Sequence, residues 1–178
     1  MAKILIVEDN QDFNKAVSAY LTQNGYDVFS AYNANEAYDV LFENPDIIHV
    51  SPATYRFAYD KTGKYIAILA PNYIYSKDEL SAKTAELKEH TDKLLSNIDP
   101  AWNDEMKALA LHDTIITNCR YSTDEKISSD DKSIYTAYGS LVNEDAVCQG
   151  YTLGYNYLLN QLGIEAHVVV SAEMNHYW

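Results

Sequence analysis

The feature that most constrains this chain is the stretch 136–178, which places a cysteine at the expected start of a helix. A polar turn at 143–145 comes first, and Cys148 follows it. From there the large side chains recur at helical spacing, and Gly163 stands where a helix is expected to stop. Unpaired N–H groups and the dipole at a helix start favour a thiolate over a thiol, so the pattern predicts a reactive cysteine.

A histidine follows this predicted helix in an order that suits a thiol nucleophile. The apolar, β-branched run 164–170 predicts a buried strand, and His176 comes shortly after it. An imidazole beside a thiol takes its proton and later protonates the leaving group. A cysteine at a helix start, then a strand, then a histidine is therefore the layout that a thiol nucleophile needs.

Five short segments carry a resemblance to a known family. They lie in order at 111–115 (LHDTI), 137–141 (AYGSL), 146–151 (AVCQGY), 158–164 (LLNQLGI) and 176–178 (HYW). With them, the chain from about residue 100 to Trp178 resembles the transglutaminase-like superfamily, a papain-related group of Cys-His-Asp enzymes. The resemblance implies the helical half of a papain-like core, with Cys148 as the nucleophile and His176 as the acid and base.

The resemblance also implies a substrate class and a reaction. An intact member of the family, a cysteine protease or acyltransferase, attacks an amide of a protein or peptide and forms an acyl-enzyme. Either hydrolysis or transfer to an amine then follows. The backbone N–H of Cys148 would help to hold the oxyanion, and no cofactor or metal ion is implied. The acidic third residue of the family would lie beyond Trp178, so the resemblance implies a C-terminally truncated core with impaired activity.

The remaining thiol and the other two histidines considered have structural interpretations. Cys119 is expected to close a helix in the core, and the two cysteines have neither a disulfide framework nor metal-ligand spacing. His112 stands beside Asp113 in a predicted helix and is expected to be a structural hydrogen-bonding group. His167 lies inside the apolar run 166–170, which favours a buried histidine with its hydrogen bonds satisfied.

The first 43 residues follow a different pattern. Strands are predicted at 3–7 and 27–32, a helix follows each of them, and Asn24 with Gly25 closes the first helix. This order predicts a parallel β-α-β-α unit. The first helix is expected to bury one apolar face, formed by Phe13, Ala16, Val17, Tyr20 and Leu21.

Within this unit, the segments 4–10, 24–26 and 34–37 resemble the start of a response-regulator receiver domain. The resemblance implies that Glu8 and Asp9 match the acid pair that helps to bind Mg²⁺ in that family. Ser51, however, falls at the phosphoacceptor position, and no later receiver strands can be placed. Glu8 and Asp9 are therefore interpreted as a strand end and a helix cap, and phosphate transfer is not expected.

A tyrosine-rich stretch joins the two ends of the chain. Short β segments are predicted at 47–51, 54–59 and 65–70, with a hairpin turn at 60–63. This stretch resembles the segment that often precedes transglutaminase-like cores in bacterial surface proteins. A capping box at Ser76 predicts a helix to about Ile98, and Pro100 is expected to open the next helix, which runs to about Tyr121.

These patterns predict an α/β to α+β protein in three parts. They are a partial receiver-like unit at 1–43, an antiparallel β segment with a connecting helix at 44–98, and a truncated transglutaminase-like core at 99–178. A natural fusion, a truncated gene product and an artificial join all remain open. Two other functions remain open as well, namely a catalytically inactive interaction module and a remnant of a two-component response regulator.

Composition narrows the partners. The chain is acidic, with a formal net charge of −13, which argues against a nucleic-acid surface. It has no apolar run of the roughly 20 residues that a membrane span needs and no signal peptide. A cytoplasmic location is therefore expected, although the family that the chain resembles is often extracellular. An unpaired sheet edge near 168–170 is expected to promote self-association.

Overall fold

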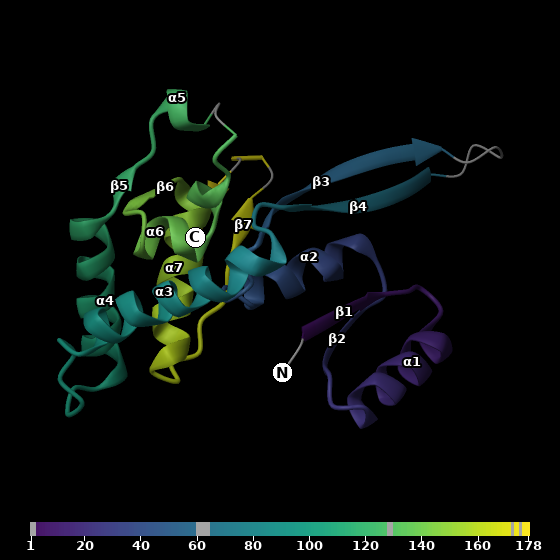
Figure 1. Ribbon diagram of the computed structural model, residues 1–178, viewed down its shortest axis with the longest axis horizontal. Helices are drawn as coiled ribbons and strands as arrows, with labels where there is room; N and C mark the ends of the chain where they lie inside the picture. The colour runs from purple at the N-terminus through teal and green to yellow at the C-terminus, as the bar shows by residue number, and fades with distance from the viewer. Residues whose placement is uncertain (1–2, 60–64, 128–129, 172, 175) are drawn as a thin grey trace. The chain divides into compact units, whose positions relative to one another are not determined.

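The computed structural model describes residues 3–59, 65–127, 130–171, 173–174 and 176–178, which form a mixed α/β protein (Figure 1). The chain divides into two compact units. The first contains Met1–Asn44 and Ala53–Ala70, and the second contains Pro45–Pro52 and Pro71–Trp178. Within the described residues, no helix combines the length and apolar character that crossing a bilayer requires.

The first unit contains the predicted β-α-β-α order. Its elements are β1 (Lys3–Val7), α1 (Gln11–Gln23), β2 (Asp27–Ala31) and α2 (Ala34–Glu43). The two strands pair in parallel, from Lys3 opposite Asp27 to Val7 opposite Ala31. Asparagine side chains cap both helices, because Asn10 accepts a hydrogen bond from the N–H of Phe13 and Asn33 accepts from two N–H groups of α2. Local sequence signals therefore set the helix starts in this unit.

Helix α1 differs from its predicted packing. Phe13 and Tyr20, expected on a buried apolar face, are exposed. Asn14 is instead completely buried, with 0% of its surface exposed. Its Nδ2 donates to the carbonyl oxygens of Glu8 at 3.3 Å and Ala31 at 3.1 Å, and its Oδ1 accepts from the hydroxyl of Ser18 at 3.2 Å. The helix is attached to the ends of both strands by an amide rather than by a broad apolar contact.

The connecting stretch contains two long strands, β3 (Val50–Tyr59) and β4 (Tyr65–Tyr73), which pair with each other. The separate strand predicted at 47–51 is wrong, because residues 45–49 are mostly turn and β3 begins at Val50 and continues without a break through the predicted segment 54–59. Ile48 is fully buried within that turn, which explains why an apolar run there need not be a strand. The hairpin turn predicted at 60–63 lies outside the described residues.

Two long helices open the helical part of the second unit, α3 (Lys77–Leu95) and α4 (Asp104–Asn118). The predicted capping box at Ser76 is confirmed. The Ser76 hydroxyl accepts a hydrogen bond from the N–H of Glu79, and the Glu79 carboxylate accepts one from the N–H of Ser76. Helix α4 begins later than predicted. Its cap is Asn103, which accepts from the N–H of Met106, and this side-chain cap outweighs the preference of Pro100 for a first helical turn.

The remaining elements are short except for one helix. They are β5 (Arg120–Tyr121), α5 (Asp124–Ile127), η1 (Ser133–Tyr135), α6 (Ala137–Leu141), β6 (Asp145–Ala146), α7 (Cys148–Gln161), β7 (Val170–Ser171) and β8 (His176–Tyr177). Helix α7 lies at the centre of the core and packs against α4, α6 and η1. The predicted stop is confirmed, because Gly163 follows the helix with a left-handed φ of 70°.

Two glycines let α7 approach its neighbours closely. A side chain added at Gly150 would meet the carbonyl oxygen of Ile134 at 2.3 Å, and one added at Gly154 would meet the hydroxyl oxygen of Ser140 at 2.1 Å. The Ser140 hydroxyl uses this closeness to donate to the Gly150 carbonyl at 2.8 Å. The backbone of α7 is therefore in direct contact with η1 and α6, without side chains of its own between them.

The run after α7 is not the buried strand that its composition predicts. Residues 164–169 lie outside any strand, and regular pairing is limited to Val170 opposite Tyr177 and Ser171 opposite His176. Val169 adds two 2.9 Å backbone hydrogen bonds to Trp178. His167 is exposed beside Glu165, 3.4 Å away, which corrects the expectation of a buried histidine. A β-branched run needs a sheet to cover it, and the pairing seen among the described residues of this segment is a two-residue antiparallel one.

Candidate functional site

Cys148 is the first residue of α7, as predicted from the sequence. The preceding Val147 supplies no side-chain cap, so the first N–H groups of the helix are not held by a cap residue. The thiol is half-buried, whereas most of the helix behind it is in the core. The backbone N–H of Cys148 donates to the hydroxyl oxygen of Tyr121 at 3.4 Å. The helix start thus presents a sulfur atom and an N–H group together near a phenol.

The pairing of β5 with β6 brings Tyr121 to this position. The two strands run parallel, with Arg120 opposite Asp145 and Tyr121 opposite Ala146. Backbone hydrogen bonds of 3.0 and 2.9 Å, Arg120 N to the Glu144 carbonyl and Ser122 N to the Ala146 carbonyl, extend the pairing on both sides. Because β6 leads directly into α7, this short pairing fixes the end of α4 against the start of the cysteine helix.

A buried carboxylate reinforces the same pairing. Oδ2 of Asp145 accepts from Nε of Arg120 at 3.0 Å and from its Nη2 at 2.8 Å, and Lys126 Nζ lies 3.6 Å away. The Asp145 side chain is 3% exposed and that of Arg120 is 74% exposed. Burial by itself would raise the pKa of Asp145, but the nearby Ser122 hydroxyl, the hydrogen bonds from Arg120 and the positive charges of Lys126 and Arg120 lower it overall. Asp145 therefore stays ionised beneath the site.

The Tyr121 side chain is held mainly by a second tyrosine. Its ring stacks on that of Tyr151 with centroids 6.1 Å apart and planes 18° from parallel. Tyr121 is 58% exposed, and removal of the rest of its side chain from water raises the pKa of the hydroxyl. The Cys148 N–H lowers this pKa, and the Cys148 side chain raises it. The phenol therefore keeps its proton at pH values where an ordinary tyrosine begins to ionise.

His176 lies in β8, which packs along α7. Its ring is half-exposed and meets the Trp178 indole edge-on, with centroids 4.8 Å apart. Among the described residues, no hydrogen bond joins the His176 ring to the Cys148 thiol or to a carboxylate. The strand that carries His176 packs on the helix that begins at Cys148, and no hydrogen bond between the two side chains is found among the described residues.

Cys119 and His112 have the structural roles expected from the sequence. Cys119 ends α4 and is 5% exposed, and burial raises the pKa of its thiol. Its carbonyl accepts a hydrogen bond from the Tyr151 hydroxyl. Nδ1 of His112 lies 3.1 Å from Oδ1 of Asp113, and its ring packs edge-on against Tyr155.

The acid pair of the first unit is arranged around the helix start. Oε1 of Glu8 accepts from the N–H of Asn10 at 3.0 Å, and Asn10 rather than Asp9 is the cap. Over the described part of the chain, no group of three or more His, Cys, Asp or Glu side chains is placed to hold a metal ion.

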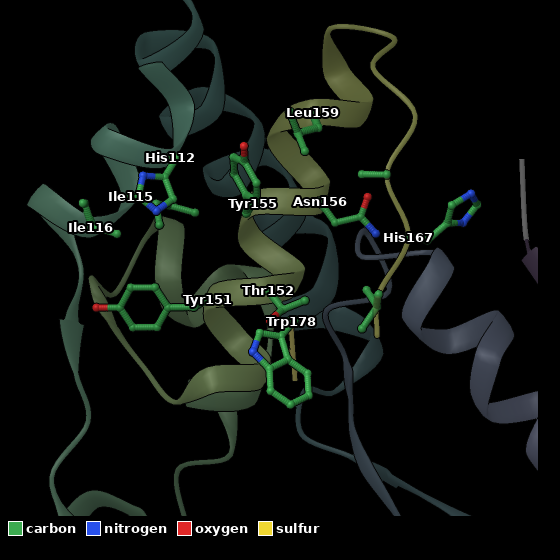
Figure 2. Close-up of a pocket in the computed structure, with 12 residues that line it drawn as sticks. His112, Ile115, Ile116, Tyr151, Thr152, Tyr155, Asn156, Leu159, His167 and Trp178 are labelled. Carbon is green, nitrogen blue, oxygen red and sulfur yellow. The ribbon is translucent and has the colours of Figure 1, made fainter. Parts of the chain in front are cut away.

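A pocket of about 320 Å³ lies along helix α7 and was not foreseen. Figure 2 shows Tyr151, Thr152 and Tyr155 projecting from α7, and His112, Ile115 and Ile116 from α4. Three hydroxyl groups in its wall donate to backbone carbonyls: Thr152 to Cys148 at 2.9 Å, Tyr155 to Ala108 at 2.9 Å, and Tyr151 to Cys119.

Asn156, in the same wall, is 4% exposed and reaches from α7 toward the segment that carries His167 (Figure 2). Within the described residues, neither its Oδ1 nor its Nδ2 has a hydrogen-bond partner.

Sequence reasoning missed Tyr121, Asp145 and Asn156. Tyr121 lies 27 residues before Cys148, and the pairing of β5 with β6 brings it there, whereas Asp145 lies in β6 itself, three residues before the cysteine. The sequence does contain one signal, an Arg-Tyr pair directly after the cysteine that ends α4. A comparison with models of known protein families found no match, and a comparison with curated protein sequences found none either.

Proposed function

We propose that this protein is a transglutaminase-like, cysteine-protease-type protein that acts on protein or peptide amides through the Cys148 thiolate. The observation that carries the proposal is the position of Cys148, a half-buried thiol on the first residue of a helix whose other residues fill the core. A rigid helix start offers both a nucleophile and an N–H donor for the oxygen of an attacked carbonyl.

The reaction would follow the usual course of thiol acyl transfer. The Cys148 thiol gives its proton to His176, and its sulfur attacks the amide carbon. A C–S bond forms, and the electrons of the C=O double bond move to oxygen, returning when the intermediate collapses. The C–N bond then breaks, and the amine leaves with a proton from His176. Water, or an amine in the case of transfer, attacks the thioester and restores the thiol.

His176 is the proposed base because β8 packs on α7, but its ring is not oriented by a carboxylate among the described residues. Losing the orienting acid of a catalytic triad costs about 10⁴ in rate in the best-studied case. Turnover on amides is therefore expected to be slow, and a single-turnover measurement is the appropriate test.

The test uses an activated ester, p-nitrophenyl acetate, as the acyl donor. We expect one acetyl group on Cys148, located by peptide mass spectrometry, and its loss on addition of a primary amine or on standing in water. Cys148→Ala abolishes the adduct. Cys119→Ala is the matched control and retains it, because the Cys119 thiol is buried in the core.

A second candidate is a catalytically inactive interaction module. It is favoured by the absence, among the described residues, of a hydrogen bond between the His176 ring and the Cys148 thiol, and by the packing of that ring on Trp178. The variant His176→Ala separates the two. A clear drop in the rate of acetylation supports the enzyme, whereas equal rates with and without the imidazole, or no adduct on Cys148 at all, support the inactive module.

A further inference from the structure

The hydroxyl group of Tyr121 lies at the backbone of Cys148. Its oxygen is 3.4 Å from the Cys148 nitrogen and accepts a hydrogen bond from that N–H group. The backbone N–H groups of the first turn of a helix point outward and bind negatively charged groups. The oxygen of a carbonyl group under attack by the Cys148 sulfur would therefore lie beside the Cys148 N–H. The phenol is therefore next to the position where negative charge would develop.

We propose that Tyr121 is a catalytic residue that donates its hydroxyl proton in a hydrogen bond to the oxyanion, alongside the backbone N–H of Cys148. This inference rests on the proposed thiol chemistry and extends it. Before substrate binds, the hydroxyl oxygen accepts from the Cys148 N–H. As sulfur attacks, the substrate oxygen replaces it as acceptor, and the O–H group then donates to the oxygen. No proton leaves Tyr121, and collapse of the intermediate returns the electrons to form the thioester and expel the leaving group.

Several contacts hold the donor in place before the reaction. Tyr121 stacks on Tyr151, whose hydroxyl is itself anchored on the Cys119 carbonyl. The β5–β6 pairing and the Arg120 bonds to buried Asp145 fix the backbone on either side. Donors that are positioned in advance stabilise developing charge without reorganising, which is the condition for an effective oxyanion site. The raised pKa of Tyr121 supports the role, since the donor then keeps its proton.

The experiment compares two reactions of the same sulfur in the full-length chain. Acetylation by p-nitrophenyl acetate develops an oxyanion, whereas alkylation by iodoacetamide displaces iodide at a saturated carbon and does not. In Tyr121→Phe we expect acetylation of Cys148 to slow roughly 10- to 100-fold, while alkylation changes less than about two-fold. Tyr73→Phe, which alters an exposed tyrosine of the same unit, serves as the matched control and leaves both rates unchanged.

Each contrary result has a distinct meaning. If the wild-type chain is acetylated on Cys148 and Tyr121→Phe reacts equally fast, the inference is wrong and the proposed function stands. If both reactions slow by the same factor in Tyr121→Phe, the tyrosine only positions the helix start, and the catalytic role is overturned. If the wild-type chain forms no acetyl adduct on Cys148, the proposed function fails and the inference fails with it.

Discussion

Two buried asparagines, one in each compact unit, differ in how their side-chain amides are hydrogen-bonded. Asn14 in α1 is fully buried, and both ends of its amide are hydrogen-bonded. Asn156 in α7 is almost as buried, and neither its Oδ1 nor its Nδ2 has a partner among the described residues. The first replaces an apolar contact between a helix and two strands. The second lines a pocket of mixed apolar and polar side chains and makes no hydrogen bond with any described residue.

The difference shows that burial of a polar group does not by itself reveal its contribution to stability. A buried amide with partners contributes modestly and becomes expensive to remove, because its partners are then left unpaired. A buried amide without partners lowers the free energy of unfolding from the start. The two residues should therefore respond to the same substitution with opposite signs.

The largest effect is expected for Asn14→Leu. The substitution removes the amide from the Glu8 and Ala31 carbonyls and buries an apolar side chain against them. The free energy of unfolding of the first unit should fall by about 3 kcal/mol. Urea denaturation, monitored through the hydrogen exchange of the backbone amides of β1 and β2, measures this change in the free energy of unfolding. Asn35→Leu, at an exposed position in α2, is the control and should change it by less than about 0.5 kcal/mol. Equal effects of the two substitutions would contradict the role assigned to Asn14.

The fold of the first unit was accessible from sequence because its signals are local. Asn10, Asn33 and Gly25 mark helix ends within a few residues of the backbone groups they serve. The prediction of an apolar face on α1 failed because a single amide, acting over 17 residues to the Ala31 carbonyl, decides how the helix lies. The predicted start of α4 was wrong for a different reason. Two local signals, Pro100 and Asn103, compete there, and the side-chain cap of Asn103 outweighs the proline.

A third buried polar group, Asp145, sharpens the comparison because it carries a charge and has partners. Asp145→Asn should lower the free energy of unfolding at neutral pH by about 2 kcal/mol, since it weakens the Arg120 pair and leaves a buried amide poorly matched. Thermal melts of the two chains measure this.

The pH dependence of the Asp145 effect has a definite sign. The pKa of Asp145 is lowered by folding, so its contribution is complete above the ordinary value of 3.8 and is lost as the pH falls below it. The gap between the wild-type and Asp145→Asn melts should therefore narrow in acid. A gap that stays constant down to the acid unfolding transition would show that the carboxylate charge plays no part.

The smallest effect is a gain. Asn156→Leu replaces an unpartnered amide with an apolar group of similar size next to Ile115 and Leu159, and should raise the free energy of unfolding by about 1 kcal/mol. Differential scanning calorimetry checks the sign. A loss of similar size would mean that the Asn156 amide has partners in solution.

The candidate site could be predicted only in part. The position of Cys148 at a helix start followed from its own neighbours, as did the end of that helix at Gly163. The surroundings of the thiol depend on the pairing of Arg120 with Asp145, which lie 25 positions apart in the sequence. A two-residue parallel pairing of this kind has no local sequence pattern from which it could be predicted. The prediction of a strand at 164–170 was wrong for a similar reason. Its apolar, β-branched composition is typical of a strand inside a sheet, but the described residues form no such sheet around it.

The glycines of α7 also limit which substitutions this helix can tolerate. Gly150 and Gly154 stand four residues apart on the face that touches Ile134 and Ser140, and even a methyl group at either would collide with its neighbour. A lineage that lost one of them would have to shift α7 along its axis or away from η1. Such a shift would carry the thiol of Cys148 out of register with the phenol of Tyr121, and it would also disturb the packing of α7 on α4, α6 and η1. Loss of either glycine would therefore be expected to reduce both thiol reactivity and the free energy of unfolding.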